Sequence, residues 1–145
     1  MDLDHNMALL KTVRPFSNII AQLRNAGLRP TRQRIALGRL LFDAEDRHVT
    51  AEMLHQEALA AKIKVSLATV YNTLNQFTGA GLLREIVVDS HRSYFDTNIT
   101  DHHHFFNGKT NKLEDINSDQ VILSALPQPP KGTQVTRVDV IVRIQ

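Results

Sequence analysis

Apolar residues recur at helical spacing through the first sixty positions of the chain. The pattern predicts three helices, over residues 15–27, 32–45 and 51–62. Gly27 closes the first helix, and Thr31 and Thr50 are suited to cap the second and third. The expected inward faces comprise Phe16, Ile19, Ile20 and Leu23, then Ile35, Leu37, Leu40 and Leu41, then Met53, Leu54, Ala58 and Leu59. This part of the chain is therefore predicted to be a helical bundle.

A fourth helix is predicted over residues 66–81, between a serine cap and two glycines. Leu67, Val70, Leu74 and Phe77 share one narrow face that would pack on the bundle. The opposite face is uncharged and polar, and it comprises Thr69, Tyr71, Asn72, Thr73, Asn75 and Gln76. Such side chains can contact base edges in a major groove, and no acid among them repels phosphate. The alternative is an ordinary solvated helix, but Glu and Lys are commoner on such a helix.

After Gly81 the pattern changes to the two-residue period of strands. Residues 82–88 and 92–96 are predicted to form a hairpin around the turn "DSHR". A helix-turn-helix followed by a hairpin is a winged helix. Arg92, near the tip of that wing, is then expected to contact a DNA phosphate.

The last third of the chain has its own pattern. A second hairpin is predicted from residues 102–107 and 112–116, then a helix over 118–126 and a final strand over 133–145. In that strand Val138, Val140, Val142 and Ile144 share one face. We expect an α+β protein with a winged helix-turn-helix domain over 1–97 and a small α/β domain over 98–145. Because so few residues make a poor core alone, the second domain is predicted to form a homodimer.

Composition narrows the possible chemistry. The 145 residues contain no cysteine, which excludes disulfides and thiolate ligands and leaves any metal to nitrogen and oxygen donors. No apolar run is long enough to span a bilayer and no leader is visible, so a cytoplasmic location is expected.

The net charge of +2 conceals a basic N-terminal segment. From His5 to Phe42 there is no acidic residue, and the basic residues there are Lys11, Arg14, Arg24, Arg29, Arg32, Arg34 and Arg39. Such a segment can face a polyanion such as double-stranded DNA, although a basic surface without a partner is the simpler alternative. A twofold protein would place two reading helices on a palindromic operator.

Three consecutive histidines, in "DHHHFFNG", begin the second hairpin. On a strand His102 and His104 share one face and His103 takes the other, so one side can serve a metal ion and the other haem. The alternative is three surface histidines with incidental metal affinity. A metal-dependent hydrolase has little support, because H-E-x-x-H, a nucleophile elbow and a glycine-rich phosphate loop are all absent. A metal-storage module would not need the basic segment or the acid-free helix, so no enzyme and no storage protein is expected.

Four motifs, "LRPTRQR", "HVTAEMLH", "SLATVYNTLNQFTGAGLLRE" and "DHHHFF", together resemble the Fur family of metal-responsive repressors over nearly the whole chain. The missing cysteine pairs and the HHH run resemble its Irr branch, the iron response regulators of alphaproteobacteria. This resemblance implies a homodimeric transcriptional regulator of haem-biosynthesis and iron-homeostasis genes that haem inactivates. The alternative is a Fur-like regulator that senses ferrous or manganous ion directly, without haem.

The resemblance also implies roles for individual residues. Tyr71 matches the family's base-contacting tyrosine, Arg29 matches the basic residue that enters the minor groove, and Asn72 departs from the arginine found there in many Fur proteins. The expected DNA contacts are Arg29, Arg32, Thr69, Tyr71, Asn72, Asn75 and Arg92.

The family's regulatory metal site maps onto His48, Asp96, His104 and Asp115, with His102 one strand-pair away. Such a donor set suits Fe, Mn, Co or Zn divalent ions. Taken singly, His48 is better explained as a helix-entry residue that binds nothing, and Asp96 and Asp115 as exposed carboxylates at strand ends. An ion held there would clamp the two domains at one angle. In Irr-like proteins the HHH run, here His102, His103 and His104, is associated with haem ligation, while the Cys-Pro haem motif of some relatives is missing.

Overall fold

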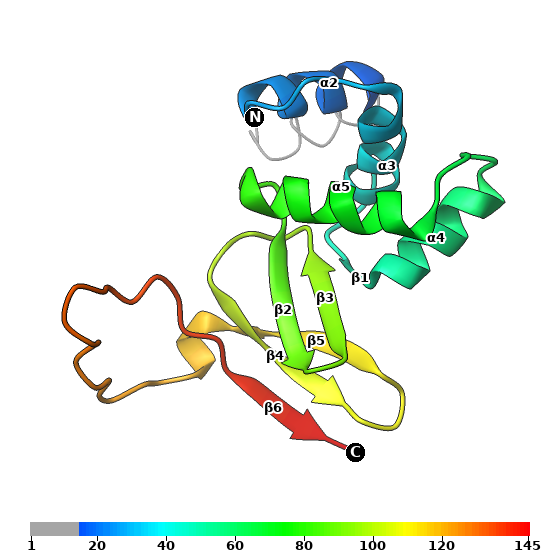
Figure 1. Ribbon diagram of the computed structural model, residues 1–145. Coiled ribbons are helices and arrows are strands. Elements are labelled where there is room, and N and C mark those ends of the chain that lie inside the picture. Colours follow the sequence, from blue (N-terminus) through cyan, green and yellow to red (C-terminus); the bar gives the residue numbers. More distant parts are fainter. Residues whose placement is uncertain (1–14) are drawn as a thin grey trace, which may run out of the picture. The chain divides into compact units, whose positions relative to one another are not determined.

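The computed structural model describes residues 15–145, and the chain divides into two compact units between Ile99 and Thr100 (Figure 1). The sequence pattern places the boundary two residues earlier. Among the described residues, four helices and three strands belong to the first unit, and three strands and one short 3-10 helix to the second, which is the mixed content of an α+β protein. Lys11 and Arg14 of the basic segment lie outside the described residues.

The four predicted helices are confirmed, with ends shifted by a few residues. They are α2 (Pro15–Asn25), α3 (Arg32–Phe42), α4 (Ala51–Ala60) and α5 (Leu67–Gly79). Each predicted cap accepts a hydrogen bond from a backbone N–H three residues on: Thr31 from Arg34, Thr50 from Met53 and Ser66 from Thr69. These bonds satisfy N–H groups that the first turn of a helix leaves unpaired, which is why the three helices begin where they do.

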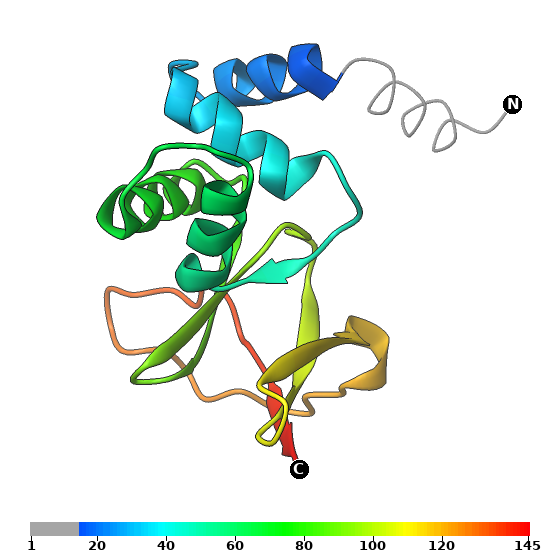
Figure 2. The same cartoon turned by 90° about the vertical axis from the view of Figure 1, so that its right-hand side faces the viewer.

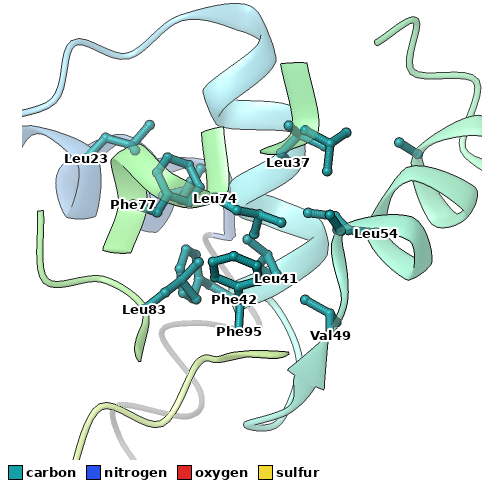
Figure 3. Packing of buried hydrophobic residues seen from close by; sticks show 14 residues of the cluster. Leu23, Leu37, Leu41, Phe42, Val49, Leu54, Leu74, Phe77, Leu83 and Phe95 are labelled. Atoms are coloured by element: carbon teal, nitrogen blue, oxygen red, sulfur yellow. The ribbon is translucent and has the colours of Figure 1, made fainter. Parts of the chain in front are cut away.

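One apolar core holds the first unit together (Figure 3). Its fully buried side chains come from all four helices and from β1 and β3, and they include Leu23, Leu37, Leu41, Val49, Leu54, Leu74, Phe77 and Phe95. The prediction that Met53 and Leu59 face inward is wrong, since they are 44% and 50% exposed. The inward stripe of α4 is Ala51, Leu54 and Ala58, whose spacing of three and four residues is too narrow to include them.

Gly38 lies where helices α2 and α3 pack closely. A Cβ at this position would lie 2.4 Å from Cδ1 and 2.8 Å from Cγ1 of Ile19, whose side chain is itself buried in the core. Glycine lowers helix stability by about 1 kcal/mol relative to alanine, so its presence in mid-helix has a packing reason.

We therefore expect Gly38→Ala to destabilise the protein by about 1–2 kcal/mol, because overpacking outweighs the gain in helix propensity. The matched control is Gly79→Ala, near the end of α5, where a Cβ would have no neighbour within 4 Å. Urea unfolding followed by circular dichroism measures both variants. A Gly38→Ala midpoint at or above that of the original protein contradicts the packing argument.

The sheet of the first unit has the antiparallel order β1-β3-β2, from β1 (His48–Val49), β2 (Arg84–Asp89) and β3 (Arg92–Asp96). The β2-β3 hairpin was predicted, whereas the two-residue strand β1 was not. In both views the helices of this unit lie together toward one end of the sheet (Figures 1 and 2). β1 runs directly into α4, and it places His48 opposite Asp96.

The second unit is a three-stranded sheet with the order β5-β4-β6, from β4 (His102–Asn107), β5 (Lys112–Asn117) and β6 (Ile141–Ile144). β4 pairs antiparallel with β5, as the predicted hairpin requires, and parallel with β6. Phe106, Leu113 and Ile116 are its buried apolar residues.

Two predictions for the second unit are wrong. Instead of a helix over 118–126 there is only the 3-10 helix η1 (Ser118–Gln120), and the strand predicted over 133–145 is limited to Ile141–Ile144. The stretch between them forms an open loop (orange in Figure 1). Ile122 is 87% exposed there, and Val142 and Ile144 are also exposed. A short helix or an amphipathic strand is stabilised mainly by packing of its apolar face, and in the described part of the chain these apolar side chains are left exposed.

Candidate metal centre

His48 and Asp96 form the first pair of possible metal ligands. The carboxylate Oδ2 of Asp96 lies 3.2 Å from Nε2 of His48, and its Oδ1 accepts a hydrogen bond from the backbone N–H of Asn98 at 2.9 Å. The Asp96 side chain is fully buried and His48 is half-buried. This corrects the alternative reading of Asp96 as an exposed strand-end carboxylate. A buried carboxylate is stable only when charge or hydrogen bonds compensate it, so this position is suited to a cation.

Arg47 fixes the strand that carries His48. Its guanidinium donates to both carboxylate oxygens of Glu57 on α4 and to the carbonyl of Leu40, at 3.2 Å. Its backbone N–H donates to Oγ1 of Thr97 at 2.8 Å, and its carbonyl accepts from the N–H of Thr97 at 3.0 Å. His48 is therefore held on a short strand anchored on two sides, which limits how far its imidazole can move.

His102, His104 and Asp115 form a second cluster, entirely within the second unit. Nε2 of His102 and Nε2 of His104 lie 3.4 Å and 3.5 Å from the same carboxylate oxygen, Oδ1 of Asp115. The two imidazole rings are 4.5 Å apart between centroids, and both are buried, whereas Asp115 is exposed. One ligand atom from each of the three residues lies within 4.8 Å of the others. His102 and His104 lie on the same face of β4 because alternate residues of a strand do so, and His104 pairs with Asp115 on the neighbouring strand β5. These two features produce the cluster.

The tautomer of His102 is determined by the backbone carbonyl of Thr100, two residues before it. Nδ1 of His102 lies 2.6 Å from the carbonyl oxygen of Thr100, which can only accept, so Nδ1 carries the proton. In the neutral ring Nε2 then carries no proton and can act as a ligand, and it is Nε2 that points toward Asp115. A second hydrogen bond of this kind is the usual way in which proteins orient a metal-binding histidine.

His103 has the opposite arrangement. The backbone N–H of Val140 donates to Nδ1 of His103 at 3.0 Å, so in the neutral ring the proton is on Nε2. Ligation through Nε2 would require the other tautomer and the loss of this hydrogen bond. The three consecutive histidines thus divide into two candidate ligands and one ring that is bonded to the neighbouring chain segment.

The donor chemistry of the two groups fits a divalent ion. Imidazole nitrogens and carboxylate oxygens are the donors that suit Fe, Mn or Zn, and the chain has no thiolate that would favour softer ions. The first pair offers one imidazole and one carboxylate, and the second cluster offers two imidazoles and one carboxylate. Every residue predicted as a metal ligand therefore lies in one of two clusters.

The residues predicted to contact DNA are distributed over the first unit. Tyr71, Asn72 and Asn75 are exposed on α5, as expected. Thr69 is half-buried and close to the helix cap, since Ser66 donates a hydrogen bond to its hydroxyl. Thr73, which the pattern placed on the polar face, is instead 4% exposed and belongs to the inward face.

Two contacts on α5 were not foreseen from the sequence. The Tyr71 hydroxyl donates to Oε1 of Glu52 on α4 at 2.7 Å, and this hydrogen bond raises the pKa of the phenol. Arg34 donates through Nε and Nη2 to Oε1 of Gln76, and through Nη1 to the carbonyl of Arg29. Sequence separation hides both contacts, because the partners are 19 and 42 positions apart.

The arginines that are predicted to contact DNA differ in their surroundings within the protein. Arg29 and Arg32 are exposed. Arg92 lies at the hairpin turn, where its Nε and Nη2 donate to Oδ2 of Asp89 at 2.9 Å and 2.7 Å. This guanidinium lowers the pKa of the Asp89 carboxyl. The guanidinium of Arg92 is therefore held at the tip of the hairpin by an ion pair with Asp89 of the same hairpin.

Comparison with known proteins decides the family. Residues 25–142 match the family model described as the ferric uptake regulator family, which is most of the chain. The chain belongs to the ferric uptake regulator family. Members of this family are metal-responsive, DNA-binding regulators, so the chain is a regulator and not an enzyme. Among residues 15–145 there is no helix with the length and apolar character needed to cross a membrane.

Individual members of the ferric uptake regulator family are similar over much of their length. A peroxide-responsive repressor PerR of Staphylococcus epidermidis is 38% identical over 103 residues, or 70% of this chain and 67% of that protein. A ferric uptake regulation protein of Bordetella parapertussis is 34% identical over 57% of this chain and 60% of its own length. The ferric uptake regulator from Pseudomonas aeruginosa, solved with manganese, is 25% identical and superposes with a TM-score of 0.68 over 88% of this chain and 96% of that one.

Proposed function

We propose that this family member is a transcriptional regulator that senses a divalent metal ion directly. One ion is held jointly by His48 and Asp96 of the first unit and by His102, His104 and Asp115 of the second. The observation that carries the proposal is the pair of imidazole Nε2 atoms of His102 and His104 on one oxygen of Asp115. Two imidazole nitrogens and a carboxylate oxygen form an incomplete coordination shell, which further donors can complete.

The short link between the clusters supports a shared ion. Asp96 and His102 are separated by only five residues, 97–101, so their Cα atoms stay within about 20 Å of each other in any arrangement. A tether of this length gives each cluster a high effective concentration near the other, and closing so short a loop has a small entropic cost. Binding one ion would therefore restrict the orientation of the two units.

Iron, manganese and zinc are the ions that we propose for this site. The nitrogen and oxygen donors accept all three, and selection among them would rest on geometry and availability. The similar regulator from Pseudomonas aeruginosa was solved with manganese. Mn²⁺ is therefore the practical ion for the first binding experiments.

For DNA, we propose that α4 and α5 act as a helix-turn-helix and the β2-β3 hairpin as a wing. Tyr71, Asn72 and Asn75 are exposed on α5 and would face base edges, with Thr69 at its first turn. Arg29, Arg32 and Arg92 would contact phosphate or the minor groove. An exposed α5 face without acidic side chains supports this assignment, because hydroxyl and amide groups can both donate to and accept from bases.

The DNA role is tested by Tyr71→Phe. We expect operator affinity to fall about threefold to tenfold, since a single hydrogen bond contributes about 0.5–1.5 kcal/mol net. Tyr71 is 40% exposed and outside the core, so the melting temperature should change little. The operator is first isolated by selection from random duplex DNA, and affinities are then measured by fluorescence anisotropy. Unchanged affinity in the folded variant removes Tyr71 from the reading surface.

We also propose that the second unit forms a homodimer, the state in which regulators of this family act. Ile122, Leu123, Leu126 and Val135 are exposed in the open loop, although they are apolar. A second copy is the partner that would cover them, because closed twofold association is the commonest form of soluble oligomer.

A haem-responsive regulator, the function implied by the Irr resemblance, is the second candidate. The lone pair on Nε2 of His102 favours it, since neutral imidazole is a common axial ligand of haem iron. The hydrogen bond from Val140 to His103 disfavours ligation by His103. The relatives described above are named as peroxide-responsive and ferric uptake regulators. Direct metal sensing is therefore the function that we favour. Haem titration of His103→Ala and His104→Ala separates the two candidates.

A further inference from the structure

The Tyr71 hydroxyl has a defined hydrogen-bond partner inside the DNA-free first unit. Its O–H donates to Oε1 of Glu52, 2.7 Å away, in the first turn of α4. Both side chains are exposed, so this bond is formed at the surface and not in the core. It joins the only tyrosine of α5 to the preceding helix.

This contact limits what the phenol can do. A phenol has one proton to donate and lone pairs with which to accept, whereas an ionised carboxylate can only accept. While the proton of Tyr71 is held by Glu52, the hydroxyl oxygen can only accept a hydrogen bond from a third group. The raised pKa of Tyr71 agrees with a proton that is retained rather than lost.

We infer that Glu52 is a specificity-determining positioning residue, which presents the Tyr71 hydroxyl to DNA as an acceptor only. The groups that such an oxygen can bind in the major groove are the amino groups of adenine and cytosine. It would reject guanine, whose O6 and N7 both accept, and thymine, whose O4 accepts. The inference rests on the proposed role of Tyr71 in reading a base.

The surroundings of the hydroxyl support this inference. Tyr71 and Glu52 line a hollow of about 350 Å³ together with Asn75 and hairpin residues 90–93, so the phenol borders open, polar space. Asn75 is one helical turn beyond Tyr71, and its amide can both donate and accept. Tyr71 would therefore supply the restricted contact on this face and Asn75 the adaptable one. The negative charge of Glu52 also opposes a phosphate at the same place, which favours a base contact over a backbone contact.

The test compares base preferences, and not affinity alone. Random duplex DNA is selected with the metal-loaded full chain, with Tyr71→Phe, with Glu52→Ala and with Glu52→Gln. Glu45→Ala is the matched control, because it removes one exposed acid from the α3–β1 connection. Tyr71→Phe identifies the operator position that the phenol reads.

At that position we expect the original protein to prefer adenine or cytosine on one strand. Glu52→Ala should reduce this preference at least about fivefold, because the freed hydroxyl can then donate as well as accept. Glu52→Gln should reduce it as well, since a carboxamide can donate to the phenol oxygen, and this variant serves if Glu52→Ala folds poorly. Glu45→Ala should keep the original preference.

A Glu52→Ala or Glu52→Gln protein that retains the full preference at the Tyr71-dependent position overturns the role of Glu52 and leaves that of Tyr71 intact. If Tyr71→Phe alters no position, the reading role of Tyr71 fails, and the inference about Glu52 fails with it.

Discussion

Replacing His104 by alanine is expected to weaken Mn²⁺ binding by at least about 100-fold. Loss of a residue that merely orients a ligand already reduces metal affinity 10- to 100-fold, and His104 is proposed as a ligand itself. Its Nε2 lies 3.5 Å from Oδ1 of Asp115, and its ring is buried. Titration calorimetry with Mn²⁺, in competition with a weak chelator, measures the change.

The adjacent His103 provides the matched control for this experiment. His103→Ala removes the same number of atoms from the same strand, but from a ring whose Nδ1 accepts the N–H of Val140. Its Mn²⁺ affinity should stay within about threefold of the original value, because the variant leaves the opposite face of β4 unchanged. Equal losses in the two variants would mean that His104 acts on the fold of the sheet and not on the metal.

Removing the metal ion is expected to lower operator affinity about 10- to 100-fold. Couplings between two ligand sites commonly amount to 1–3 kcal/mol, and here the coupling would arise because an ion bound to both units selects the orientations that fit DNA. Fluorescence anisotropy with the selected operator, before and after chelation and then with Mn²⁺ restored, measures the effect at fixed ionic strength.

Two controls make this second result specific. His104→Ala should bind the operator with the low affinity of the metal-free protein and should not respond to Mn²⁺. Non-specific DNA should show little dependence on the ion, because that binding depends mainly on phosphate contacts. An operator affinity that is the same with and without the ion contradicts the proposed regulation, even where the ion binds tightly.

Much of the fold follows from local pattern. The three helix caps, the two hairpins and the alternation of His102, His103 and His104 were all predictable, since each depends on residues within a few positions of one another. For the same reason the opposite faces of β4 were predictable. Two of the residues that the sequence proposed as metal ligands, His102 and His104, lie in the same cluster because they are alternate residues of one strand.

What the sequence could not predict depends on distant partners. Strand β1 has only two residues, and it exists because β3 pairs with it. The tautomers of His102 and His103 are decided by two backbone groups, at Thr100 and Val140, whose positions no periodicity reveals. The failed helix over 118–126 had the right apolar spacing but lacked a surface to pack on, which is a property of the folded chain or of its partner.

The central claim is that one ion is shared by donors from both units, and counting ions tests it most directly. Mn²⁺ is titrated into the original protein, His48→Ala, His104→Ala and the double variant, with bound metal counted after equilibrium dialysis. We predict one tightly bound ion per chain, strongly weakened by either single change, with the double variant losing less than the sum of the two free-energy changes. Undiminished binding by His48→Ala, or two ions bound independently to the original protein, would contradict the account.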